Sequence, residues 1–172
     1  MRMAEFGLQA VVEAFRFFLP AYVANTAAGV FGGGVPLDFG RRLWDGRRLF
    51  GDGKTLKGTG TGVLCGVLYK VVENLYLSRT ILAGAGLAFL LAVGAIAGDI
   101  AASFIKRRLD IESGESAPLL DQLDFVVGGL LLAGLAVKIS METVIILLLI
   151  TPVGHLGVNI IGFLLHKKEV PW

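Results

Sequence analysis

Residues 81–98 read ILAGAGLAFLLAVGAIAG, a stretch of eighteen residues without one charged side chain. An α-helix of this length reaches most of the way across the hydrocarbon core of a bilayer, which is about 30 Å thick. The rest of the chain is similar in character, because 55% of its 172 residues are hydrophobic and only 17% are charged. A soluble domain is rarely so apolar, so the sequence predicts a membrane protein.

Four further stretches on either side of this segment are long and apolar enough to be membrane helices. They are residues 17–37, 58–77, 119–139 and 143–166. The second stretch is weaker because it contains Lys70 and Glu73, and 119–139 reaches spanning length only by including Asp121. The sequence therefore predicts an all-α, polytopic membrane protein with about five transmembrane helices, built as a single domain over residues 1–172.

The basic residues predict how this bundle is oriented. Eleven lysines and arginines fall in the loop 38–57, in the segment 106–118 and in the C-terminal tail, whereas the connections on the other side carry three. Because positively charged loops stay in the cytoplasm, we expect the N-terminus outside and the C-terminus inside. Both polar loops, about 38–57 and 106–118, are then cytoplasmic.

Composition also argues against some functions. The formal net charge is only +2, which gives no sign of nucleic-acid binding. Cys65 is the only cysteine, so the chain has neither an internal disulfide nor a multi-cysteine metal site.

Polar side chains gather directly after the predicted helix 81–98 and at the start of the next predicted helix, 119–139. Asp99, Ser103 and Lys106 are spaced i, i+4 and i+7, so they share one helix face. Asp121 and Asp124 are spaced i, i+3 and repel each other unless a cation lies between them. Carboxylates together with phosphate oxygens are the usual ligands of Mg²⁺, so the pattern predicts a metal site. The alternative is that these acids only form ion pairs with Lys106, Arg107 and Arg108.

The first polar loop reads GDGKTLKGTG over residues 51–60 and combines glycine, lysine and hydroxyl groups. Such a loop can wrap phosphates with backbone N–H groups while Lys54 and Lys57 neutralise their charge. A P-loop is excluded, because Arg48 stands where that motif needs a glycine and no strand precedes it. The alternative is a polybasic segment that touches anionic lipid headgroups.

Several polar groups lie within the apolar helices. Thr151, His155 and Asn159 recur every four residues, a stripe better explained by interhelical hydrogen bonds than by ligand contact. Asn25 either bonds a neighbouring helix or faces a substrate cavity. Lys70 and Glu73 are expected to neutralise each other.

The run SFIKR at residues 103–107, followed by DQLD at residues 121–124, resembles the signature of CTP-dependent phosphatidate cytidylyltransferases. The small size and the loop 51–60 look more like the archaeal branch of that family, the CDP-archaeol synthases. Some positions depart from the bacterial pattern. Glu112-Ser113 and Pro118-Leu119-Leu120 replace a Lys-Asp pair and His-Gly-Gly, and Gln122 replaces an arginine.

This resemblance implies a CTP:lipid-phosphate cytidylyltransferase of the cell membrane, dependent on Mg²⁺, with its active site facing the cytoplasm. The acceptor would be 2,3-bis-O-geranylgeranyl-glycerol 1-phosphate, the unsaturated archaeal ether lipid phosphate, and the products CDP-archaeol and pyrophosphate. The resemblance carries over six residues to this chain, namely Asp99, Ser103, Lys106, Arg107, Asp121 and Asp124. We expect the three aspartates to hold the metal, Lys106 and Arg107 together with Lys54 and Lys57 to clamp phosphates, and Ser103 to bond a phosphate oxygen. Thr55 and Asn25 are expected to complete the nucleotide site.

Two other functions are weighed against this one. A small ion or proton transporter could use Asp99, Asp121, Asp124 and His155 as a relay, but the acids cluster at one end of the bundle rather than along it. A CDP-alcohol phosphotransferase would need a motif that is absent here. The small number of helices leaves room for a homodimer interface.

Overall fold

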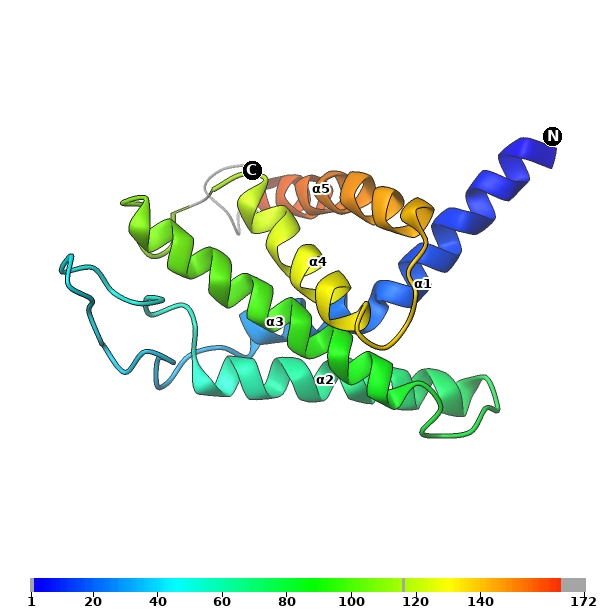
Figure 1. Ribbon diagram of the computed structural model, residues 1–172, viewed down its shortest axis with the longest axis horizontal. Coiled ribbons are helices and arrows are strands. Elements are labelled where there is room, and N and C mark those ends of the chain that lie inside the picture. The colour runs from blue at the N-terminus through cyan, green and yellow to red at the C-terminus, as the bar shows by residue number, and fades with distance from the viewer. Residues whose placement is uncertain (1, 116, 165–172) are drawn as a thin grey trace.

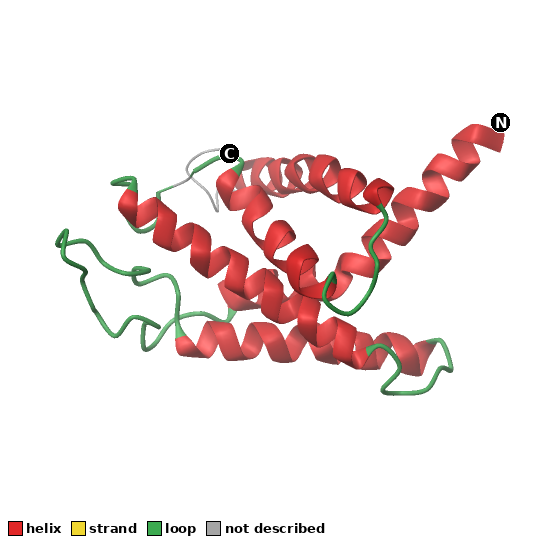
Figure 2. Ribbon diagram, in the orientation of Figure 1, coloured by secondary structure: helices red, strands yellow, loops and turns green. Residues whose placement is uncertain are grey.

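The protein is a bundle of α-helices, and the computed structural model describes residues 2–115 and 117–164. In chain order the helices are α1 (Arg2–Val30), α2 (Leu56–Tyr76), α3 (Ala85–Arg108), α4 (Leu120–Ala133) and α5 (Met141–Leu164). Figure 2 shows helices joined by loops, and the β-type pairing in the described residues is limited to isolated bridges within the segment 36–55. The all-α prediction is confirmed.

The helices bring the two polar loops to the same end of the bundle. In Figure 1, α2 and α3 converge toward the turn that joins them, and α4 packs across α3. Helix α1 packs against both α2 and α3, while α5 contacts α4 and α1. The segment 31–55 and the connection from α3 to α4 lie together at one end of the molecule, and the turn between α2 and α3 lies at the other (Figure 1).

The first three helices differ from the predicted crossings mainly at their ends. Helix α1 starts at Arg2 rather than residue 17, because scattered charges do not prevent a helix from continuing toward the N-terminus. It ends at Val30, seven residues before the predicted end, ahead of the glycine run 32–34, in which Gly33 and Gly34 adopt positive φ. Helix α2 begins two residues early because Thr55 caps its first turn: the hydroxyl accepts from the Gly58 amide at 3.0 Å.

The fourth predicted crossing is wrong as a single helix. Helix α4 has 14 residues and is about 21 Å long, which is shorter than the apolar core of a bilayer. The chain turns at residues 134–136, where a helical pattern had been expected to continue to residue 139. Of the described helices, α3 alone combines the length and the apolar composition that a crossing needs, and Met141–Gly157 forms a shorter apolar stretch.

Because the described residues end at 164, the last two residues of the predicted crossing 143–166 and the basic tail 167–168 lie outside them. The number of crossings and the orientation of the termini stay predictions.

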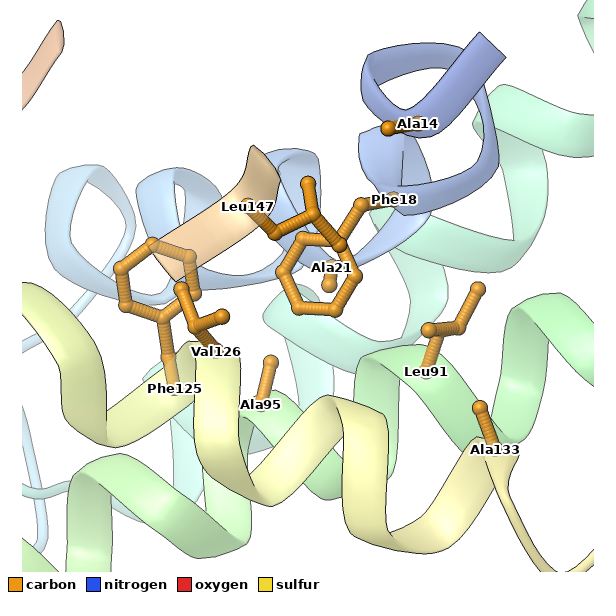
Figure 3. Close-up of a cluster of buried hydrophobic side chains, with 9 residues drawn as sticks. All are labelled: Ala14, Phe18, Ala21, Leu91, Ala95, Phe125, Val126, Ala133 and Leu147. Carbon is orange, nitrogen blue, oxygen red and sulfur yellow. The ribbon is translucent and has the colours of Figure 1, made fainter. Parts of the chain in front are cut away.

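Aromatic and small side chains fill the centre of the bundle, as Figure 3 shows. Phe18 is fully buried, and its ring lies edge-on to Tyr22 at a centroid separation of 5.2 Å. Phe125 of α4 joins the same cluster at 5.6 Å from Tyr22. These rings connect α1 with α4 where direct contact between the two helices is limited, so they help to fix the position of α4.

Glycines set the spacing between the helices. A Cβ atom added at Gly98 would collide with the backbone oxygen of Asp124, and one added at Gly94 would collide with that of Gly128. Gly62 and Gly66 of α2 approach α1 in the same way, at Ala24 and Pro20. Small residues let membrane helices pack backbone against backbone, and Gly62, Gly66 and Gly128 allow such close packing here. By contrast, a Cβ atom added at Gly86 would meet no other atom within 4 Å.

The α3–α4 crossing gives a direct test. We expect Gly98→Ala to destabilise the protein by about 1–3 kcal/mol, because its methyl group has to push the Asp124 backbone away. Gly60→Ala is the matched control: Gly60 is an exposed glycine of α2 with no atom within 4 Å, and alanine favours helix there by about 1 kcal/mol. In thermal unfolding measured in detergent, Gly98→Ala should have a lower Tm than the wild type, whereas Gly60→Ala should not. Equal Tm values for Gly98→Ala and the wild type would contradict the close contact.

Candidate functional site

A polar cavity of about 640 Å³ opens at the end of the bundle where the two polar loops meet. All five helices and both loops contribute to its wall, α2 through Gly58 and Thr59 of its first turn. Eight of the ten predicted site residues line it: Asn25, Lys54, Thr55, Asp99, Ser103, Lys106, Arg107 and Asp121. The predicted shared face of α3 is confirmed, because Asp99, Ser103 and Lys106 all face this one space.

Two carboxylate–lysine pairs line the cavity. Lys54 Nζ donates to both carboxylate oxygens of Asp99, at 2.6 and 2.7 Å. Lys106 Nζ donates to both oxygens of Asp121, at 2.9 and 3.1 Å, and to the Glu115 carbonyl at 2.7 Å. These two pairs therefore place two anionic and two cationic groups in the cavity wall, and the charges neutralise each other within each pair.

The alternative for these acids was that they only form ion pairs with Lys106, Arg107 and Arg108. Asp121 does pair with Lys106, as that alternative expected, but Asp99 pairs with a lysine from the first loop. All four side chains remain partly exposed, between 11% and 30%, so they are accessible to a ligand in the cavity.

Two predicted site residues lie elsewhere. Lys57 is exposed on the first turn of α2 and is not part of the cavity wall. Asp124 is also absent from the wall, and its Oδ1 accepts from the Phe125 amide at 2.5 Å. Residues three apart on a helix differ by about 60° in direction, so Asp121 can face the cavity while Asp124 does not. In the described residues no group of three His, Cys, Asp or Glu side chains is arranged to hold a metal.

A buried aspartate shapes the first loop. The Asp38 side chain is fully buried and accepts hydrogen bonds from the amides of Gly40, Phe50 and Gly51, each at 3.0 Å. Arg48 adds two more donors, at 2.7 and 3.2 Å. Burial disfavours the charge of Asp38, but Arg48 and the three amides outweigh it and hold the pKa of this carboxyl well below its usual range.

The loop is also tied directly to its neighbours. The Lys54 carbonyl accepts from the Leu37 amide at 2.7 Å, which joins Lys54 to the segment next to Asp38. Arg47 donates to the Arg108 carbonyl at 2.6 Å, and Arg108 donates to the Arg48 carbonyl at 2.5 Å. Arg47 and Arg48 are thus used inside the protein rather than as lipid-contacting groups, and they dock the loop on the end of α3.

Sequence reasoning missed several residues of the cavity wall. Phe50, Ser113, Glu115 and Gln122 all line it, yet none belonged to the predicted site. Ser113 and Gln122 had been assigned no role because they depart from the bacterial signature, and a lone phenylalanine in a loop carries no pattern. Among the predicted residues, the Thr55 hydroxyl is engaged as the cap of α2, so its part in nucleotide binding stays a prediction.

The polar stripe of α5 has two uses. Thr151 hydrogen-bonds Tyr22 of α1 at 2.5 Å, which confirms the interhelical interpretation for that residue. His155 lines the cavity, and the side chain of Asn159 lies outside the described ones.

At the opposite end of the bundle, the predicted Lys70–Glu73 pair is present at 2.6 Å, and Arg16 joins it at 3.5 Å.

Comparison with known proteins gives consistent similarities. The family model described as "CarS-like: CDP-archaeol synthase" matches residues 8–172. The CDP-archaeol synthase of Methanocaldococcus jannaschii is 47% identical over 91% of this chain and 94% of its own length. That of Methanopyrus kandleri is 47% identical over 99% and 100%.

A solved structure is similar as well. It is described as "an intramembrane enzyme for archaeal membrane lipids biosynthesis" and superimposes with a TM-score of 0.79 at 42% identity. The match covers 87% of this chain and 94% of that one.

The Asp38 network predicts a stability change that depends on pH. We expect Asp38→Asn to destabilise the protein by about 3 kcal/mol near neutral pH, because Arg48 loses its buried anionic partner. Since the folded pKa of Asp38 lies below the unfolded value of about 3.9, its stabilisation is complete above that pH and decreases as the pH falls below it.

Melting curves of the two proteins between pH 3 and pH 7 measure both effects. The difference in Tm should be largest at pH 5–7 and shrink toward pH 3. A difference that does not change with pH would contradict the ionised, buried state of Asp38.

Proposed function

The chain belongs to the CDP-archaeol synthase family, and from this premise we propose that it transfers the cytidylyl group of CTP to a lipid phosphate. The acceptor would be 2,3-bis-O-geranylgeranyl-glycerol 1-phosphate, and the products CDP-archaeol and pyrophosphate. A phosphate oxygen of the lipid forms a bond to the α-phosphorus of CTP while the bond to the β-phosphate breaks. The observation that carries the proposal is the polar cavity whose wall contains both the Lys54–Asp99 and the Lys106–Asp121 pair.

The reaction chiefly requires two polyanions to meet. A lipid phosphate is already ionised at neutral pH, so no side chain has to remove a proton from the nucleophile. Catalysis then depends on aligning the two phosphates and on neutralising the charge that develops on pyrophosphate. Lys54 and Lys106 supply cations to the cavity, and Ser103 in the same wall offers a hydroxyl to a phosphate oxygen.

The residues present also fit a magnesium ion. Mg²⁺ is commonly bound by one or two carboxylates together with substrate phosphates, and Asp99 and Asp121 both line the cavity. We propose these two as its protein ligands and omit Asp124, whose carboxylate is not part of the wall. When bound, the ion would supply positive charge to the triphosphate.

The lysine pairs suggest how the protein accommodates its substrates. Without a ligand, Lys54 and Lys106 neutralise Asp99 and Asp121. With triphosphate and lipid phosphate in the cavity, each lysine would be free to turn to a phosphate oxygen, which would leave Asp99 and Asp121 available to hold Mg²⁺. The exchange keeps every charge in the cavity paired, which limits the desolvation cost of assembling so many ions.

We propose that the chain crosses the cell membrane several times and that the cavity lies on the cytoplasmic side, where CTP is found. The apolar α3 and the similarity to an intramembrane enzyme support the membrane setting. The bias of basic residues toward the loops around the cavity supports the cytoplasmic side. The transporter alternative is not favoured, since the polar residues that it would need surround one end of the bundle.

Two lysines three residues apart allow a matched comparison. We expect Lys54→Ala to reduce the rate of cytidylyl transfer about 100-fold, because a cation beside the reacting phosphates is lost. Lys57→Ala, which removes an exposed lysine outside the cavity, should keep activity within about twofold of wild type. Pyrophosphate release from CTP measures both. An equal loss in the two variants would show that the cavity wall does not define the phosphate site.

The function itself is tested with radiolabelled CTP. Purified protein in detergent, given Mg²⁺ and the unsaturated archaeal ether lipid phosphate, should move the cytidylyl label into the lipid extract. Chelation of Mg²⁺ and the Asp121→Asn variant should each remove this activity, and phosphatidic acid as acceptor reports the chain preference. Absence of label in lipid with both acceptors would overturn the proposed reaction.

A further inference from the structure

The first polar loop carries a tryptophan that the rest of the protein leaves uncovered. Trp44 is 90% exposed, more than any other large hydrophobic side chain in the described part of the sequence. It does not belong to the cavity wall. Figure 1 shows the loop reaching beyond the start of α2, toward the last turn of α3. Tryptophan is enriched where a protein meets a partner or the interface of a membrane, so this side chain indicates a contact outside the protein.

Backbone hydrogen bonds place Trp44 on a tight turn. The Leu43 amide donates to the Arg47 carbonyl at 3.0 Å, and the Gly46 amide donates to the Leu43 carbonyl at 3.0 Å. Arg42 Nη1 adds a bond to the Gly46 carbonyl at 2.7 Å. Gly46 has φ +76°, a left-handed conformation that glycine adopts without strain. The exposed indole thus belongs to an ordered turn.

The charges around this turn leave an excess of positive groups. The three acids of the loop are paired within the protein: Asp38 and Asp52 with Arg48, and Asp45 with Arg108 of α3 at 2.8 Å. Arg41 and Arg42 are exposed, and neither forms an ion pair with a residue that the structure describes. Two uncompensated cations therefore lie within three residues of Trp44, a combination that suits an anionic partner.

The ion pair between Asp45 and Arg108 also indicates the depth of the turn in the membrane. Helix α3 has 24 residues, so it is about 36 Å long. It exceeds the hydrocarbon core of about 30 Å, and the basic last turn that ends at Arg108 fits the headgroup layer. Asp45 contacts Arg108 and directly follows Trp44, so the indole lies near the level of the headgroups. This is the depth at which tryptophan is enriched in membrane proteins.

We propose that residues 41–44 form a docking surface for the anionic headgroup layer of the membrane around the helices. Trp44 enters the interface between headgroups and chains, while Arg41 and Arg42 contact lipid phosphates. The proposal rests on the proposed membrane setting and is independent of the transfer reaction. It gives the first loop an attachment besides α3, so that the segment carrying Lys54 is held against the membrane from which a lipid phosphate would arrive.

The competing occupant is a protein, such as a second copy of this chain. The position of the turn beside the end of α3 favours lipid, because headgroups surround that depth in any bilayer and no further binding event is needed. Both occupants shield the indole from water, but only lipid brings hydrocarbon chains next to it. Quenchers attached to the lipid chains therefore separate the two.

The experiment measures Trp44 fluorescence in the full chain with Trp172→Phe, which leaves Trp44 as the only tryptophan. The protein is reconstituted in phosphatidylcholine vesicles with or without about one third phosphatidylglycerol, and the phosphatidylcholine chains are brominated or plain. Bromine should remove about half of the emission in the anionic vesicles and clearly less in the neutral ones. Salt at about 1 M, which screens charges beyond about 3 Å, should bring the two values together.

Variants in the same background test the charges. Arg41→Gln combined with Arg42→Gln should lower the quenching in anionic vesicles to the neutral value. Arg41→Gln alone leaves the bond from Arg42 to the Gly46 carbonyl in place and should give about half of that reduction. The matched control combines Arg79→Gln with Lys138→Gln, which removes two exposed basic residues outside this loop and should behave like the parent chain.

Emission that brominated chains do not quench would overturn the docking surface. If that emission is also shifted to the blue, the occupant is a protein; if it is typical of water, the turn contacts neither partner. Equal quenching in neutral and anionic vesicles, or in the two double variants, would reject the anionic partner. Flotation with the vesicles separates the two levels: a chain that floats without quenching contradicts the docking alone, and one that does not float contradicts the membrane setting as well.

Discussion

The backbone contact between α3 and α4 is the constraint on which the site depends. Gly98 and Gly94 let the two helices touch at Asp124 and Gly128, where any side chain would force them apart. Asp99 directly follows one of these glycines, and Asp121 lies one turn before the contact on α4. The same contact therefore brings two carboxylates from different helices to one cavity, and a change of spacing at the glycines would be passed directly to them.

The first loop adds the second requirement, which is charge balance. Without Lys54, Asp99 would be an uncompensated charge within the apolar helix α3. Lys54 reaches it because a network around the buried Asp38 orders the preceding loop and because Arg47 and Arg108 dock that loop on α3. Acids and cations are thus assembled by separate segments, and their pairing is what allows the cavity to be both polar and stable before any ligand arrives.

Local patterns in the sequence predicted the helices and part of the site. Asp99, Ser103 and Lys106 share a face because helix periodicity alone decides it. The Lys54–Asp99 pair joins residues 45 positions apart, and Asp38 is buried by loop folding, so neither could be read from spacing. Asp124 was grouped with Asp121 by proximity, although the turn of the helix directs it elsewhere. The short α4 was missed because the apolar composition continues past its end.

We propose that Asp99 and Asp121 exchange their lysine partners for Mg²⁺ when the triphosphate binds. The most direct measurement is a crystal structure with Mn²⁺ and a CTP analogue that cannot be cleaved, in which anomalous scattering locates the ion. This exchange predicts a metal peak beside the carboxylates of Asp99 and Asp121, with Lys54 and Lys106 turned to phosphate oxygens. A metal bound to other residues, with both carboxylate–lysine pairs intact, would contradict it.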